Sequence, residues 1–267
     1  VTDTSFRAYD SLAIRAAAIP VMFVGAIPLP AYYLLYKLDL SSVASDSQIR
    51  WLFALCVGGS IAILGALYAH GVYPLTLRAT VHATFQFVSA ISCTGFYTVS
   101  SIGRKWTVIP VLLLTMAMSL GGASGSTASG IKIVRARSIG RGLRERVREP
   151  FPEEVLPSID DSVEDEHASS NYHCASVITA LWAAMFVLGV FVLLVTLPIQ
   201  SAGIPLQSVL FTVTSAQGNV GLVSGIVTPS TPVVGAATKL MLTFNMWVGR
   251  LEVVPVLVFF RSLVWEP

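Results

Sequence analysis

Long apolar runs separated by short polar stretches follow one another along the whole chain. A helix that crosses a membrane needs about 20 mostly apolar residues, so the pattern predicts four or five transmembrane helices. They cover the runs 17–36, 51–69, 108–120, 177–198 and 233–264. The third run passes at Leu120 into a glycine-rich stretch. Pro20, Pro28 and Pro30 are expected to bend the first run.

Two further apolar segments, 81–91 and 205–213, are too short to span a membrane. Segments of about 10–14 residues are more often re-entrant than spanning. Each of the two lies between full-length runs and ends in a polar stretch that contains glycine. The order long–short–long therefore occurs twice, over 51–137 and 177–264. This predicts an internal repeat of helix, pore helix and helix.

The composition agrees with this pattern. Of the 267 residues, 54% are hydrophobic and 12% are charged, against about 45–50% and about 25% in average soluble domains. This excludes a soluble enzyme, a disordered chain and a nucleic-acid-binding protein with a basic face, so no nucleic-acid partner is expected. The three cysteines lie far apart and predict neither a disulfide framework nor a zinc site. The chain is expected to be an integral membrane protein.

Basic residues gather after the third long run, between Lys132 and Arg148. Cytoplasmic loops carry such an excess, so this end of the helices is predicted to face the cytoplasm. Counting the crossings from there also places the C-terminus in the cytoplasm. The stretch 149–167 is rich in acidic residues and proline. It is interpreted as a solvated linker between the repeats, either a plain spacer or a contact for a cytosolic partner.

The residues after the two short segments are the candidates for chemistry. They read Ser92-Cys93-Thr94-Gly95-Phe96 and Ser215-Ala216-Gln217-Gly218-Asn219-Val220-Gly221-Leu222. Non-helical backbone at membrane depth is tolerated where it is buried or lines a water-filled path. A pore helix aims its partially negative end at such a path, and extended residues beyond it can present carbonyl groups to a dehydrated cation. The two turns, with glycine to turn the carbonyls inward, predict a cation filter.

Four segments with distinctive sequences occur in the order 93–96, 121–132, 215–222 and 249–252. In this order they resemble motifs of the TrkH/KtrB type of the Trk/Ktr/HKT superfamily of potassium transporters. Cys93 stands where the filter of that family's third unit usually has threonine. Ser129 stands where its glycine-rich intramembrane loop more usually has glycine. The resemblance extends from about residue 16 to residue 265.

The resemblance implies an all-α polytopic membrane protein, built from helix–pore-helix–helix units around a pseudo-fourfold pore. The family carries four such units, and this chain supplies two. We therefore expect the chain, which begins with Val1, to be the C-terminal half of a protein whose N-terminal half is missing here or is a separate chain. The expected parts are the end of the preceding unit (1–47), the third unit (48–140), a cytoplasmic linker (141–171) and the fourth unit (172–267).

The resemblance also assigns two groups of site residues. The filter would bind K⁺ through the backbone carbonyls of Cys93, Thr94, Gly95, Gln217, Gly218 and Asn219. The gate would consist of Gly121, Gly122, Gly125, Ser126, Thr127, Gly130, Lys132 and Arg250. Arg250 would point at the glycine-rich loop and repel cations while the gate is shut.

The gate assignment has a physical reason and open alternatives. Four glycines within ten residues cannot hold a helix firmly, since each costs about 1 kcal/mol relative to alanine. The alternative for these small residues is close helix packing. Lys132 could instead be an anchor at the cytoplasmic interface, and Arg250 could pair with Glu252 or extend to that interface.

The expected function is potassium uptake by channel-like conduction in the plasma (inner) membrane. The resemblance further implies a homodimer, regulated by a cytosolic nucleotide-binding ring of the TrkA/KtrA type. No cofactor is expected in this chain, because K⁺ is the transported ion and nucleotide would bind only the regulatory partner. No constellation of catalytic residues indicates an enzyme. Two alternatives stay open: a non-conducting membrane scaffold subunit, and a symporter that couples K⁺ to Na⁺ or H⁺.

Overall fold

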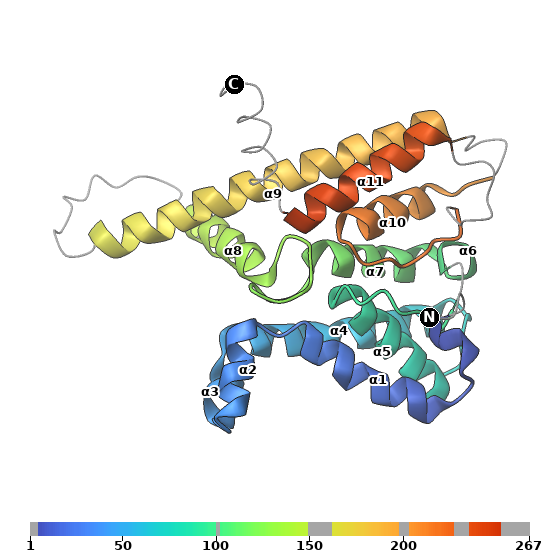
Figure 1. Cartoon of the computed structure of the whole chain (residues 1–267), viewed down its shortest axis with the longest axis horizontal. Coiled ribbons are helices and arrows are strands. Elements are labelled where there is room, and N and C mark those ends of the chain that lie inside the picture. The colour runs from blue at the N-terminus through green and yellow to red at the C-terminus, as the bar shows by residue number, and fades with distance from the viewer. Residues whose placement is uncertain (1–4, 100–101, 149–161, 198–202, 227–234, 252–267) are drawn as a thin grey trace.

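A computed structural model describes residues 5–99, 102–148, 162–197, 203–226 and 235–251. Within these ranges the chain forms helices joined by loops, without a β-strand (Figure 1). The helices are η1 (Ser5–Ala8), α1 (Leu12–Gly25), α2 (Leu29–Tyr36), α3 (Leu40–Ser45), α4 (Ser47–Ala69), α5 (Leu77–Ile91), α6 (Ile102–Lys105), α7 (Val108–Leu120), α8 (Ile133–Arg148), α9 (Ser162–Thr196), α10 (Leu206–Gln217) and α11 (Ala236–Leu251). The predicted all-helical membrane fold is confirmed.

Two described helices are long and apolar enough to cross a membrane, judged by length and composition. They are α4 and the Tyr172–Thr196 part of α9. The run 17–36, expected as one bent helix, forms parts of two helices: α1 and α2 meet at a bend of 106°. The bend follows from Pro28 and Pro30 at the start of α2, since neither has the N–H that a continued helix needs.

Parts of the predicted elements fall outside the described residues. The last predicted span, 233–264, is described only over α11, and 252–267 cannot be compared with the prediction. The predicted linker, 141–171, contains the end of α8 and the start of α9, with 149–161 between them outside the described residues.

The six central helices form two units of three. In the first unit α4, α5 and α7 all contact one another, and in the second α9, α10 and α11 do the same. The middle helix of each unit, α5 with 15 residues or α10 with 12, is followed by a non-helical turn. The units join where α7 packs against α10 (Figure 1). This arrangement matches the repeat that the apolar runs predict.

The short helix α5 is held by packing on several sides. α1, α4 and α7 contact it, and every residue from 85 to 91 is buried. The ring of Phe87 lies against Gly59 of α4, where an added Cβ atom would collide with it. Burying such a ring contributes about 1.5–3 kcal/mol. The surrounding helices therefore fix the place at which α5 ends.

Candidate functional site

The short helices α5 and α10 end in the same backbone turn. Two turn residues and a segment without regular secondary structure follow each helix, and we call residues 92–96 the first turn and 218–222 the second turn. In the first turn the N–H of Thr94 donates to the carbonyl of Ser89, with nitrogen and oxygen 3.1 Å apart. In the second the N–H of Val220 donates to the carbonyl of Ser215 at 2.9 Å. The two turns thus share one hydrogen-bond register.

Backbone dihedrals repeat in the same register. Cys93 and Asn219 have φ values of 54° and 51°, and two residues later Gly95 and Gly221 have φ values of 76° and 85°. The left-handed region costs a residue with a side chain about 1–2 kcal/mol, while glycine enters it freely. The surrounding contacts therefore hold both turns in a shape that their own backbone does not favour.

A serine hydroxyl fastens each turn to the helix before it. Ser89 Oγ donates to the carbonyl oxygen of Phe96 at 2.7 Å, and Ser215 Oγ donates to that of Leu222 at 2.7 Å. Both serines are buried in the last two turns of their helices. Each hydroxyl thus orients the carbonyl group of the last turn residue, Phe96 or Leu222, toward the preceding helix.

The common register shows which residues of the two turns are equivalent. Residues 93–95 correspond to 219–221, whereas the sequence prediction places the filter at 217–219. Gln217 is the last residue of α10, and its buried side chain donates to the carbonyl of Trp182 at 2.8 Å. Gly218 follows in a right-handed conformation and caps the helix. Of the three predicted residues, only Asn219 lies in the segment equivalent to 93–95.

The two turns lie against each other and against α11. A Cβ atom on Gly95 would collide with the carbonyl oxygen of Val220, so the backbones touch there. A Cβ atom on Gly249 of α11 would collide with the carbonyl oxygen of Gln217. The side chain of Asn219 donates to the carbonyl of Met246, also in α11, at 2.9 Å. Because Gly95 and Gly249 have no side chain, the first turn can contact the backbone of the second turn, and α11 can contact the backbone at the end of α10.

The glycine-rich loop, residues 121–132, separates α7 from α8 and closes on itself. The N–H of Ile131 donates to the carbonyl of Ser119 at 2.9 Å, and the N–H of Lys132 donates to that of Leu120 at 2.9 Å. Gly121, with φ of 67°, faces the carbonyl of Ser129 so closely that a Cβ atom would collide with it. The end of α7 and the start of α8 therefore lie next to each other, and the loop begins and ends at the same place.

Lys132 is the last residue of this loop and is buried. Its side chain is 8% exposed, and its ammonium group donates to the carbonyl of Ala128. Its backbone has φ of 74°, a conformation that residues with side chains adopt only when their surroundings enforce it. The side chain of Lys132 is therefore bound within the loop and does not extend toward solvent.

Hydrogen bonds hold the loop to the bend between α1 and α2. They run from Leu29 N to Gly125 O at 3.0 Å, from Ala123 N to Ala26 O at 3.2 Å and from Thr127 Oγ1 to Gly25 O at 2.9 Å. The break between α1 and α2 frees backbone groups that need partners when buried, and the loop supplies them. The loop is therefore held more firmly than its glycine content suggests.

Two further contacts join the loop to the predicted filter region and to α11. Cys93 Sγ of the first turn lies 3.7 Å from the carbonyl oxygen of Ser129 and can donate to it. Arg250 Nη1 donates to the carbonyl oxygen of Thr127 at 3.2 Å. The structure thus brings the loop, Arg250 and the first turn together.

Sequence reasoning assigns no role to the side chains of Ser89, Ser215 and Gln48 at this site. Gln48, the second residue of α4, accepts a hydrogen bond from the N–H of Ser124 in the loop, with Oε1 and nitrogen 3.0 Å apart. The two serines could be found by superposing the repeats on their turns, because each precedes its turn by the same spacing. No sequence pattern points to Gln48, which meets the loop only through the fold.

A family profile and the sequences of known proteins all relate this chain to cation transporters. The sequence profile of the family described as "TrkH: Cation transport protein" matches residues 1–265. The chain is 30% identical to the Trk system potassium uptake protein TrkH of Escherichia coli K12 over 267 residues, which is 99% of this chain and 53% of that protein. It is 28% identical to the uncharacterized cation transporter MJ1485 of Methanocaldococcus jannaschii over 94% of this chain and 48% of that protein.

A solved structure shares the fold. The crystal structure of the potassium transporter TrkH from Vibrio parahaemolyticus superposes with a TM-score of 0.78, at 22% identity, over 99% of this chain and 55% of that chain. The chain thus spans about half the length of the relatives it matches. The profile match covers nearly the whole sequence. The chain belongs to the TrkH family of cation transport proteins.

Proposed function

We propose that the complete protein conducts potassium ions across the membrane and that the two turns form part of its selectivity filter. The observation that carries this proposal is their identical backbone form, with matched positive φ values at Cys93 and Asn219 and at Gly95 and Gly221. Two turns with unrelated side chains and one backbone shape indicate that the backbone performs the function. The relative in Escherichia coli is a potassium uptake protein, which supports the choice of ion.

The chemistry of a dehydrated cation favours such turns. Backbone carbonyls can replace the hydration shell of K⁺, and the C-terminal ends of α5 and α10 add partial negative charge beside them. Two turns enclose only part of a path. The chain spans about half the length of its relatives, so the proposed pore has two further arms around a pseudo-fourfold axis.

The glycine-rich loop is the proposed gate, and its described arrangement is the proposed shut state. Arg250 adds a positive charge at the loop by donating to Thr127, and a cation beside it would be repelled. Opening then requires the loop to give up hydrogen bonds to Arg250, to Gln48 and to the bend between α1 and α2. A segment with two discrete hydrogen-bonded arrangements is a suitable switch.

The wider assembly is proposed from the family alone. We infer a homodimer in the plasma membrane, with the C-terminus and the basic helix α8 on the cytoplasmic side. A nucleotide-binding ring of the TrkA/KtrA type would regulate it, and nucleotide would bind there rather than in this chain. The positive charge of α8 supports the proposed orientation, since cytoplasmic segments carry such an excess.

Reconstitution tests the proposal. The complete protein in liposomes is expected to pass K⁺ or Rb⁺ down a gradient without Na⁺ or a pH gradient, which distinguishes conduction from symport. Gly95→Ser and Gly221→Ser should reduce the preference for K⁺ over Na⁺. Gly71→Ser is the matched control, because Gly71 also has a positive φ, of 67°, but lies outside both turns. Absence of flux in folded protein would favour the non-conducting scaffold, and unchanged selectivity in both turn variants would exclude the filter assignment.

A further inference from the structure

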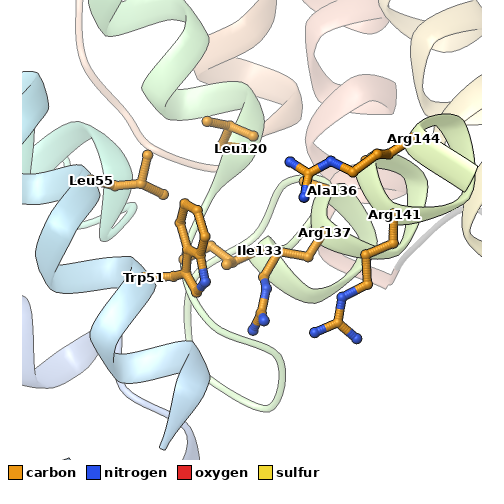
Figure 2. Close-up of a pocket in the computed structure, with 9 residues that line it drawn as sticks. Trp51, Leu55, Leu120, Ile133, Ala136, Arg137, Arg141 and Arg144 are labelled. Carbon is orange, nitrogen blue, oxygen red and sulfur yellow. The ribbon is translucent and has the colours of Figure 1, made fainter. Parts of the chain in front are cut away.

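A pocket of about 460 Å³ opens between α4 and α8, away from the two turns (Figure 2). One wall is apolar and consists of Trp51 and Leu55 from α4 together with Leu120 and Ile133. Trp51 lies in the second turn of a helix that is apolar and long enough to span a membrane. Tryptophan concentrates at the boundary between the headgroups and the hydrocarbon region, so the pocket would lie near the membrane surface.

The opposite wall is basic. Arg137, Arg141 and Arg144 line it from α8, at spacings that put them on one face of the helix (Figure 2). Arg137 donates to the hydroxyl of Ser47, and its guanidinium carbon lies 5.6 Å from the center of the Trp51 ring. Among the carboxylates that the structure describes, none forms an ion pair with these three arginines. Their positive charge is thus concentrated at one open pocket.

An apolar wall opposite a basic wall fits an amphiphile with an anionic head. We propose that this pocket binds an anionic phospholipid of the cytoplasmic leaflet. The three guanidinium groups would hold the phosphate, for which their fork of N–H donors is well suited. An acyl chain would follow Trp51 and Leu55 along α4. A lipid with a net negative charge is favoured over a zwitterionic one, because a cationic headgroup would face the same arginines.

The site also has a structural relation to the glycine-rich loop. Leu120 and Ile133, which line the pocket, are the residues on either side of that loop. Ser47, the partner of Arg137, is followed by Gln48, which accepts from Ser124 in the loop. A lipid in the pocket would therefore bridge α4 and α8 at the base of the loop and stabilise that base.

Native mass spectrometry of the complete protein in detergent tests binding without any transport assay. The probes are phosphatidylglycerol, which is anionic, and phosphatidylcholine, which is zwitterionic. We expect preferential retention of phosphatidylglycerol, and about fivefold weaker retention in Arg137→Gln and in Arg141→Gln, the factor for one basic group near an anionic headgroup. Arg50→Gln is the matched control, since Arg50 is an exposed cation on α4 that does not line the pocket.

Three outcomes would overturn the proposal. They are equal retention of the two lipids, equal losses in Arg141→Gln and Arg50→Gln, and displacement of phosphatidylglycerol by millimolar inorganic phosphate, which would indicate a site for a soluble anion. Arg141→Lys keeps the charge and should restore most of the retention. Equal thermal unfolding midpoints of Arg141→Gln and Arg141→Lys would show that lost binding does not reflect lost folding.

Discussion

The guanidinium group of Arg250 donates a hydrogen bond to the carbonyl oxygen of Thr127, with Nη1 and the oxygen 3.2 Å apart. Arg250 comes from the last described helix, α11, and Thr127 from the loop between α7 and α8. The contact therefore ties the second three-helix unit to the loop of the first. In the proposed mechanism it is one of the bonds that break when the loop moves.

Replacing Arg250 with glutamine is expected to raise flux by at least about tenfold. A hydrogen bond from a charged donor contributes about 1.5–3 kcal/mol, and its loss shifts the loop toward the open arrangement by that amount. The measurement is Rb⁺ uptake into liposomes that contain the complete protein. Lys239→Gln removes an exposed cation from the same helix without touching the loop and should leave flux unchanged. Equal flux in Arg250→Gln and the parent would count against a gating contact.

The serines that fasten the two turns make a paired prediction. Ser89→Ala and Ser215→Ala each remove one hydroxyl bond to a turn carbonyl, which contributes about 1 kcal/mol. Each substitution should therefore lower the K⁺ over Na⁺ preference in ion-competition measurements by a similar factor. Ser60→Ala is the control, because Ser60 is a buried serine that bonds only to its own helix, at Cys56. A loss as large in Ser60→Ala would show that these effects are not specific to the turns.

Gly249→Ala is expected to destabilise the protein. Its Cβ would collide with the carbonyl oxygen of Gln217, and such overpacking costs about 1–3 kcal/mol. Gly65→Ala is the matched control, because Gly65 lies within α4 with open space at its Cβ position. That variant should be as stable as the parent or more stable, since alanine favours helix by about 1 kcal/mol. Thermal unfolding in detergent that ranks Gly249→Ala at or above Gly65→Ala would contradict the close approach.

Gln48→Leu tests the hold of α4 on the loop. The substitution removes the acceptor for the N–H of Ser124 while keeping the side chain's approximate size. Flux should rise about two- to fivefold, since a neutral hydrogen bond contributes about 0.5–1 kcal/mol. Gln207→Leu is the control: Gln207 bonds to Gly103, away from the loop. A fall in flux for Gln48→Leu alone would mean that this bond holds an open arrangement instead.

The sequence predicts the two turns because the apolar segments before them, 81–91 and 205–213, are too short to span a membrane. Within the second turn region it centres the filter on Gly218, because glycine attracts the assignment, whereas Gly218 caps α10 in an ordinary right-handed conformation. Asn219 takes the left-handed position instead. Asparagine is among the residues that tolerate this conformation, but only the hydrogen-bond register shows which of two adjacent residues adopts it.

For the glycine-rich loop, too, the sequence predicts some features and not others. Its glycines and the charge of Arg250 indicate an interruption of the helix and a cation beside it, and both are present. The partners of the loop come from the bend between α1 and α2 and from Gln48, far away along the chain. Contacts between residues so far apart along the chain cannot be predicted from the local sequence of the loop. The firmness of the loop therefore could not be predicted from its composition.

The bonds from Ile131 to Ser119 and from Lys132 to Leu120 isolate the loop mechanically. Because the two ends of the loop are clasped together, its tip can be displaced while α7 and α8 keep their places. In the proposed gating, such a motion breaks a ring of hydrogen bonds around the tip and leaves the buried helix packing in place. Under that proposal, substitutions in the ring change how readily ions pass without changing how stably the helices assemble.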